Sequence, residues 1–188
     1  MTQKVPALQT VENLTAAALT IQINAAAAAA QAAASVKLSG DVVQVVNTIV
    51  GTVATGTTIL PFDNTIPQNT EGDQFMSLAI TPTNAANTLL IEVVTVLAGS
   101  VGSNFTSALF QDTTAGALAA AITSQASAGL PMTTSFKHKM LAGTTSPTTF
   151  KVRCGNGSAG TVTFNGASGA QLMGGVMASS ITITEIKA

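Results

Sequence analysis

The chain has 188 residues, of which only 8% are charged, and its formal net charge is −1. Globular proteins usually carry roughly 25% charged residues, so we expect partner chains to cover part of a surface with so little charge repulsion. The seven Lys and Arg residues are widely spread, which argues against the clustered positive charge that nucleic-acid binding requires. This length accommodates one modest domain with an extension.

Apolar segments and cysteine usage narrow the class of protein further. The start of the chain lacks a basic segment followed by an apolar core, so no secretory signal is predicted and we expect synthesis in a cytosol. The longest strongly apolar runs, 25–30 and 89–94, are far shorter than the roughly 18–20 residues that span a membrane, so no membrane partner is expected. The single cysteine, Cys154, excludes an intrachain disulfide. Stability must therefore come from packing and assembly.

The first forty residues predict a tip followed by a helical stalk. Residues 1–9 show no periodicity and are interpreted as a flexible or partner-bound tip, and residues 10–39 are predicted to form an Ala-rich helix that Gly40 ends. Small and apolar positions alternate three and four apart, which favours a coiled coil of identical helices, most simply three. This seam comprises Val11, Leu14, Ala18, Ile21, Ala25, Ala28, Ala32 and Ser35. The alternative is one helix packed on a globular body.

Residues 40–188 change to the pattern of short β-strands. Residues 42–50 are apolar on both faces, which predicts a strand buried on both sides. The strongest strand signal is the β-branched run 88–98. About eight short strands, spaced roughly ten residues apart with Gly-containing turns, indicate a mainly β fold, an antiparallel jelly-roll-like sandwich that forms a knob on the stalk.

The reactive residues do not form a catalytic signature. His138 is the only histidine, so a metal site would need three copies to meet on an axis, and a strand histidine satisfied within the fold is the simpler interpretation. Cys154 follows the cation Arg153, which can lower a thiol pKa, but no acid–base pair accompanies it. Glu71 and Asp73 share a polar loop that holds too few ligands for calcium. We therefore expect no enzyme activity, no metal and no cofactor.

Glu92 interrupts the apolar run 88–98. On a surface between subunits its carboxylate could pair with Lys151 or Arg153 of a neighbouring chain. The alternative is an outward-facing, solvated carboxylate.

Several segments of the strand region resemble the C-terminal β-knob of tailed-bacteriophage virion proteins. The resemblance covers about residues 41–188 and is carried by ITPTNAANTLLIEV, SALFQDTTAGALAA, LAGTTSPTTFKVRCGNGSAGTVTFNG and GGVMASSITITEI. Within these segments, Phe110, Gln111 and Asp112 match a Phe-Arg-Asp-like or Phe-Gln-Asp-like element, and residues 180–186 match a Ser-Ile-Thr-Ile-Glu-Ile-like end. Members of that family are homotrimers of jelly-roll type displayed on fibres, spikes or heads.

This resemblance implies a non-enzymatic, homotrimeric virion protein, either a capsid decoration (cement) protein or a head fibre. Its tip would anchor it to the major capsid protein on the capsid surface through Thr2, Gln3, Lys4, Val5 and Pro6. The alternative is a receptor-binding tail fibre or spike tip, whose loops 99–104 and 155–160 would contact a host-surface ligand.

Overall fold

The computed structural model describes residues 18–28 and 38–188. The chain divides into two compact units, Met1–Leu38 and Ser39–Ala188. The predicted tip, including Thr2, Gln3, Lys4, Val5 and Pro6, lies outside the described residues, as do the seam positions Val11, Leu14, Ala32 and Ser35.

Residues 18–28 form a helix in which every residue is exposed, as expected for a segment rich in alanine, the strongest intrinsic helix former. Within these residues Ile21 is the only large side chain at a seam position, beside Ala18, Ala25 and Ala28. Leu19 and Ile23 are also exposed but are four residues apart, so they share a different face. The coiled coil stays a prediction. Among the described residues, no helix is long and apolar enough to cross a membrane.

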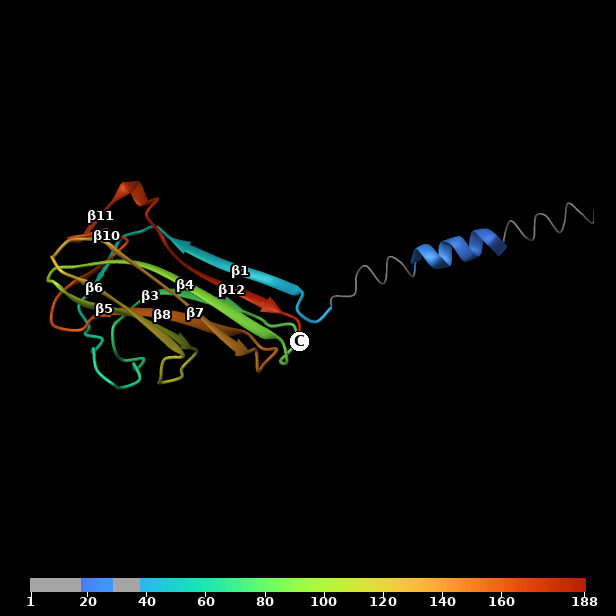
Figure 1. Cartoon of the computed structure of the whole chain (residues 1–188), viewed down its shortest axis with the longest axis horizontal. Helices are drawn as coiled ribbons and strands as arrows, with labels where there is room; N and C mark the ends of the chain where they lie inside the picture. Colours follow the sequence, from blue (N-terminus) through green and yellow to red (C-terminus); the bar gives the residue numbers. More distant parts are fainter. Residues whose placement is uncertain (1–17, 29–37) are drawn as a thin grey trace, which may run out of the picture. The chain divides into compact units, whose positions relative to one another are not determined.

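The second unit is built of β-strands and one short 3-10 turn (Figure 1). Its eight longer strands are β1 (Val42–Val50), β3 (Asp73–Ile80), β4 (Thr88–Gly99), β5 (Ser103–Gln111), β6 (Ala119–Gln125), β7 (Met132–Leu141), β8 (Thr148–Asn156) and β12 (Ser179–Ile186). The shorter elements are β2 (Ala54–Gly56), β9 (Val162–Phe164), β10 (Gly166–Ala167), β11 (Ala170–Gln171) and η1 (Met173–Gly175).

The eight longer strands form antiparallel pairs in which the first strand in the sequence pairs with the last, the second with the seventh, the third with the sixth and the fourth with the fifth. β1 pairs with β12, β3 with β8, β4 with β7, and β5 with β6. Two further pairings, β12 with β4 and β8 with β5, join these hairpins into sheets. This nesting of strand pairs defines a jelly roll, so the predicted mainly β, jelly-roll-like sandwich is confirmed.

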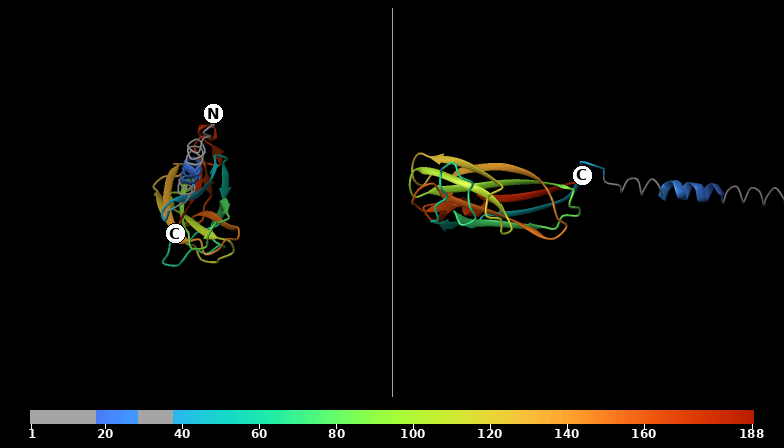
Figure 2. Two further views of the ribbon diagram at one scale, coloured as in Figure 1. Left: turned by 90° about the vertical axis from the view of Figure 1, so that its right-hand side faces the viewer. Right: turned by 90° about the horizontal axis from the view of Figure 1, so that it is seen from below.

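The two sheets form the layers of the sandwich (Figure 2). The first sheet has the order β1-β12-β4-β7, and β9 and β2 extend it beyond the end of β12 along β4. The second sheet has the order β3-β8-β5-β6. β6 lies beside β7, so the two sheets approach each other along that side.

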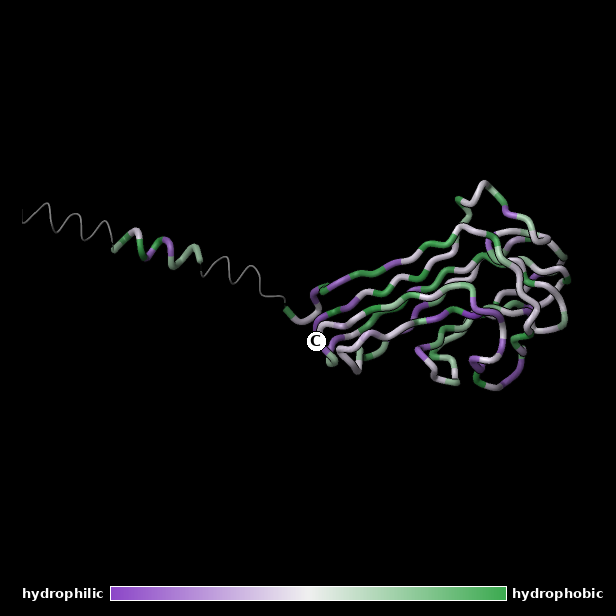
Figure 3. The backbone as a smooth tube through the Cα atoms, turned by 180° about the vertical axis from the view of Figure 1, so that it is seen from behind, coloured by the Kyte–Doolittle hydropathy of each residue, from purple (hydrophilic) through white to green (hydrophobic). Residues whose placement is uncertain are grey.

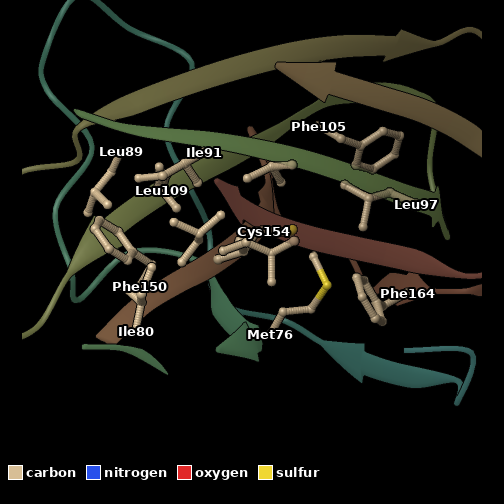
Figure 4. Close-up of a cluster of buried hydrophobic side chains, with 14 of the residues drawn as sticks. Met76, Ile80, Leu89, Ile91, Leu97, Phe105, Leu109, Phe150, Cys154 and Phe164 are labelled. Carbon is tan, nitrogen blue, oxygen red and sulfur yellow. The ribbon is translucent and has the colours of Figure 1, made fainter. Parts of the chain in front are cut away.

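The core lies between the sheets because apolar and polar residues alternate along the strands (Figure 3). β12 shows the alternation clearly, with Ile181 and Ile183 fully buried and the neighbouring Thr182 and Thr184 partly exposed. The buried cluster draws on both sheets (Figure 4). Its largest members are Phe105, Phe150, Phe164, Leu89, Ile91, Leu97, Leu109, Ile181 and Ile183.

A smaller apolar cluster lies on the outside of the second sheet. Leu60, from the loop between β2 and β3, packs on Ala108 and Phe110 of β5, and Ala117 joins them. The loop is fixed there by a hydrogen bond from the Leu60 amide to the Asn156 carbonyl, 3.0 Å. The outer face of the second sheet is therefore partly covered by its own chain.

The prediction that residues 42–50 are buried on both sides is wrong. β1 is an edge strand whose one strand partner among the described residues is β12, and its outward side chains Val42, Val45 and Ile49 are 52%, 55% and 68% exposed. An irregularity in register between Val42 and Gln44 places Val42 on the same side as Val45. No part of residues 18–28 or 38–188 buries this apolar side of β1.

Candidate self-association face

The outward side of the first sheet is a surface of four strands whose register places the side chains in rows. From β1 across β12 and β4 to β7, the rows are Val42, Ile186, Thr88, Leu141; then Val45, Thr184, Leu90, Lys139; then Asn47, Thr182, Glu92, Lys137; then Ile49, Ser180, Val94, Ser135. We call these sixteen residues the outer face. Most of them are apolar, hydroxyl or amide residues, and Lys137, Lys139 and Glu92 are its charged members.

The polar groups in the middle of the outer face have partners within the chain. Glu92 pairs across the strands with Lys137, with 3.3 Å between the Glu92 carboxylate and the Lys137 Nζ. The Asn47 side-chain amide donates to the Thr182 hydroxyl at 2.7 Å. Because these groups already satisfy one another, covering them with a second surface costs less than burying unpaired polar atoms. The outer face is therefore suited to association.

The structure places the three predicted intersubunit residues on opposite sides of the sandwich. Glu92 is on the outer face, whereas Lys151 and Arg153 belong to β8 on the outward side of the second sheet. Each has a partner within the chain: Lys151 donates to the Asp112 carbonyl at 2.7 Å, and Arg153 donates to the carbonyls of the loop before β3. A contact between Glu92 and either cation of another subunit stays a prediction.

His138 and Cys154 are not arranged for catalysis. His138 lies on the inward side of β7, opposite Ile91, and burial lowers the pKa of its imidazole below the usual value. Cys154 is fully buried, and burial raises the pKa of its thiol to about 12 despite a hydrogen bond with the Ser107 hydroxyl. A thiol with that pKa is not a nucleophile near neutral pH. Within residues 18–28 and 38–188, no group of three His, Cys, Asp or Glu side chains could hold a metal ion.

The carboxylates of the predicted polar loop bind the backbone of their own region. Glu71 accepts a hydrogen bond from the Gln68 amide at 2.8 Å, and Asp73 accepts from the Thr58 amide at 2.9 Å and its hydroxyl at 2.8 Å. These contacts fix the long connection between β2 and β3.

Sequence reasoning missed the most strongly bound carboxylate, that of Glu185. Its side chain is fully buried and accepts hydrogen bonds from Gln44, Asn87 and the amide and hydroxyl of Thr83. Burial alone would raise the pKa of Glu185, but these donors outweigh it and lower the pKa to about 2. The signal was present in the alternation of β12, because Ile181, Ile183 and Glu185 share one side of a strand.

Two loops predicted as contact loops lie side by side at one end of the sandwich. The Gly157 amide donates to the Asn104 carbonyl at 2.8 Å, and the hydroxyls of Ser103 and Ser158 are 3.1 Å apart. A cavity of about 450 Å³ opens at this end, lined by Ser100, Ala128, Gly129, Thr161, Thr163, Ser168 and Gly169. Since none of these side chains titrates near neutral pH, the lining supplies no general acid or base.

Residues 60–188 match the family of the Pgp3 C-terminal domain. These residues include seven of the eight longer strands. The chain belongs to the Pgp3 C-terminal domain family. No curated protein sequence matches it.

Several solved structures are distantly similar to this Pgp3-family chain. The Eiger TNF structure from S. frugiperda is 9% identical, with 77% of this chain and 94% of that chain covered and a TM-score of 0.42. The EclA C-terminal domain, described as a sugar-binding protein, is 18% identical over 81% of this chain and 79% of that one, with a TM-score of 0.31. Infectious bursal disease virus, Gx strain, is 12% identical, covering 81% and 40%, with a TM-score of 0.38. The jelly-roll assignment rests on the strand pairing itself.

The Pgp3 match overturns the resemblance to phage virion knobs. The expected functions of capsid decoration, head fibre and tail-fibre tip are wrong, as is the expected location on a capsid. The capsid protein expected as a partner, with its anchor at Thr2, Gln3, Lys4, Val5 and Pro6, loses its support. The segments that suggested the phage family form strands and turns of the jelly roll: Phe110 and Gln111 end β5, and Asp112 occupies the turn after it with φ 50°.

Proposed function

We propose that this Pgp3-family chain is a non-enzymatic binding module that assembles as a homotrimer through the outer face of its first sheet. The observation that carries the proposal is the exposed apolar side of the edge strand β1, formed by Val42, Val45 and Ile49. An exposed apolar edge strand invites pairing with other chains and is usually covered or charged in stable monomers. Within the part of the chain that the structure describes, this side of β1 is neither covered nor charged, so we take a second copy as its cover.

The contrast between the two sheets supports this choice of surface. The outside of the second sheet carries the Leu60 loop, which buries Phe110 to 1% exposure. Among the described residues, no such loop lies on the outer face of the first sheet, and this face has few charges. A three-chain ring forms when the β1 edge of one subunit meets a different part of the next subunit's outer face, since such head-to-tail contacts close by rotation.

The N-terminal segment 10–39 is proposed as a helical stalk of the same trimer. Its described part has Ile21 at 68% exposure and Ala18, Ala25 and Ala28 at the same seam. Three helices wrapped along this seam would cover Ile21. The residues 1–9 are proposed as a tip that precedes the stalk, and residues 40–188 as the knob.

The absence of enzyme activity is part of the proposal. In the described residues the His138 side chain makes no hydrogen bond, Cys154 is a buried thiol, and the carboxylates of Glu71, Asp112 and Glu92 are bound by an amide, by an amide and a hydroxyl, and by a lysine, respectively. The family is that of the Chlamydia plasmid virulence protein Pgp3. We propose that this chain acts by binding a host component rather than by chemistry.

The mass of the full chain, measured by light scattering during size-exclusion chromatography at about 10 µM, tests the assembly. The expected mass is three times that of one chain, 18.7 kDa. Ile49→Lys places a charge on the exposed side of β1 and is expected to give monomers. The matched control is Ile122→Lys on β6, where the isoleucine is 44% exposed and lies on the other sheet. A wild-type monomer, or a trimer that Ile49→Lys leaves intact, would contradict the proposal.

A further inference from the structure

A polar pocket lies on the outward side of the second sheet, away from the outer face. It has a volume of about 280 Å³ and is formed by β3, β5, β8, the turn after β5 and the loop before β3. Its lining residues are Asn69, Gln74, Phe110, Asp112, Thr113, Lys151 and Arg153. Lys151 and Arg153 are two apart on β8, so both project to this side of the sheet.

The two cations of the pocket bind carbonyl oxygens rather than carboxylates. The Lys151 Nζ donates to the Asp112 carbonyl at 2.7 Å, and the Arg153 Nε and Nη2 donate to the carbonyls of Glu71 and Gly72 at 2.8 and 2.7 Å. In the described part of the chain, no carboxylate oxygen lies within 4.0 Å of either cationic group. These bonds hold both side chains in place and leave further N–H donors on each.

The acids near the pocket are engaged elsewhere. The Asp112 carboxylate accepts hydrogen bonds from the Thr148 hydroxyl at 2.8 Å and from the Thr149 amide at 2.7 Å. The Glu71 carboxylate binds the Gln68 amide. The lining thus carries two positive charges and the single negative charge of Asp112, which leaves one positive charge without a counter-charge.

We propose that this pocket binds the carboxylate group of a small ligand. Guanidinium and carboxylate match as planar groups joined by two parallel hydrogen bonds, and Lys151 adds a second cationic donor. Gln74 is exposed, lies opposite Arg153 in the register of β3 and β8, and its side-chain amide has no hydrogen-bond partner among the described residues, so it supplies another donor. One uncompensated positive charge suits a singly charged carboxylate better than a doubly charged phosphate or sulfate.

Titration of the full-length, ¹⁵N-labelled protein with sodium glucuronate, followed by NMR, tests this site. Glucuronate is the probe because it combines one carboxylate with a small polar frame. Saturable shifts are expected for the side-chain amide of Gln74 and the Nε of Arg153. Glucose, the neutral analogue, is expected to leave both signals unmoved, and sodium sulfate at the same ionic strength is expected to bind at least about tenfold more weakly than glucuronate.

Two variants separate binding from folding. Lys151→Gln is expected to weaken glucuronate binding at least about tenfold. Gln74→Glu changes an exposed side chain without a hydrogen bond and introduces a carboxylate that competes for Arg153, so it is expected to abolish binding with an unchanged melting temperature. Lys187→Gln removes a cation that lies after β12, outside both the pocket and the outer face, and is the matched control, with unchanged affinity expected.

Three results would overturn the assignment. The first is the absence of saturable shifts at Gln74 and Arg153. The second is sulfate binding as tight as that of glucuronate, which would indicate a general anion site. The third is a loss of assembled mass in Lys151→Gln while Lys187→Gln stays assembled, because the pocket would then receive an acid from a neighbouring subunit.

Discussion

Glu185 is the residue whose environment departs most from what its side chain prefers in water. Four protein hydrogen-bond donors take the place of water around its buried carboxylate, and they lower its pKa to about 2. Because this pKa is lower in the folded state than the usual value of about 4.3, the ionised side chain stabilises the fold above that value. The stabilisation is lost as the pH falls from about 4.3 towards 2.

Glu185→Gln is therefore expected to lower the free energy of unfolding at pH 7 by about 1–3 kcal/mol. The new amide would face the Gln44 amide, which donates to Oε2 in the native chain. Urea denaturation at pH 7 and pH 3 measures the effect: the difference between wild type and variant should shrink at pH 3. Glu92→Gln, whose carboxylate forms a surface ion pair, is the control and should cost about 0–1 kcal/mol. A pH-independent difference would contradict this role for Glu185.

Cys154 gives a second prediction for a single residue. With a pKa of about 12 and full burial, the thiol should not react with iodoacetamide at pH 8 while the protein is folded. The same thiol should react fully in urea. Mass spectrometry of the labelled protein measures both states, and rapid labelling of the folded protein would show that β8 opens or that the thiol is accessible.

Single residues were predictable where strand alternation decides their side. The alternation of β7 places Lys137 and Lys139 on the side of the strand opposite His138. The partner of Glu92 was not predictable, because Lys137 is distant in the sequence and only the β4–β7 register joins them. The pocket around Lys151 and Arg153 was not predictable for the same reason, since residues from three distant parts of the sequence line it.

At the scale of elements, the strand positions were predictable but the neighbours of each strand were not. Apolar residues on both sides of residues 42–50 indicated burial, yet β1 is an edge strand with an open side. Sequence pattern reports which side chains avoid water, and a surface between chains produces the same pattern as a core. The apolar pattern of residues 42–50 therefore accounts both for the wrong prediction of burial and for the proposed association face.

The contact between β8 and the loop before β3 leads to a prediction about packing. A Cβ on Gly155 would lie 2.6 Å from the Leu60 Cβ and 2.8 Å from the Leu60 amide nitrogen. Because one of these atoms belongs to the backbone, the loop must move, and Gly155→Ala should lower the free energy of unfolding by about 1–3 kcal/mol. Gly116→Ala, which meets only the Ile66 methyl at 3.3 Å, is the milder control. Thermal unfolding of both variants provides the measurement, and equal melting temperatures would contradict the predicted clash.

At the scale of the whole molecule, the knob has a substantial core although aromatic residues make up only 4% of the chain. In the structure, Phe105, Phe110, Phe150 and Phe164 are each at most 1% exposed, so four of the seven phenylalanines are buried within one chain. The knob thus has a core of its own, and the jelly-roll class was predictable from strand number and spacing. Its family was not, since alternating strands and Gly-containing turns indicate a fold class that many unrelated proteins adopt.

A knob with its own core can still depend on assembly for its stability, and this dependence is measurable. If three chains associate through their outer faces, the folded trimer is favoured by mass action and its melting temperature rises with protein concentration. We expect an increase of a few degrees between about 1 and 100 µM of the full chain. Ile49→Lys should melt at a lower temperature that does not change with concentration, because its assembly surface carries a charge. Ile122→Lys should follow the wild type, and a wild-type melting temperature that is the same at all concentrations would count against the trimer.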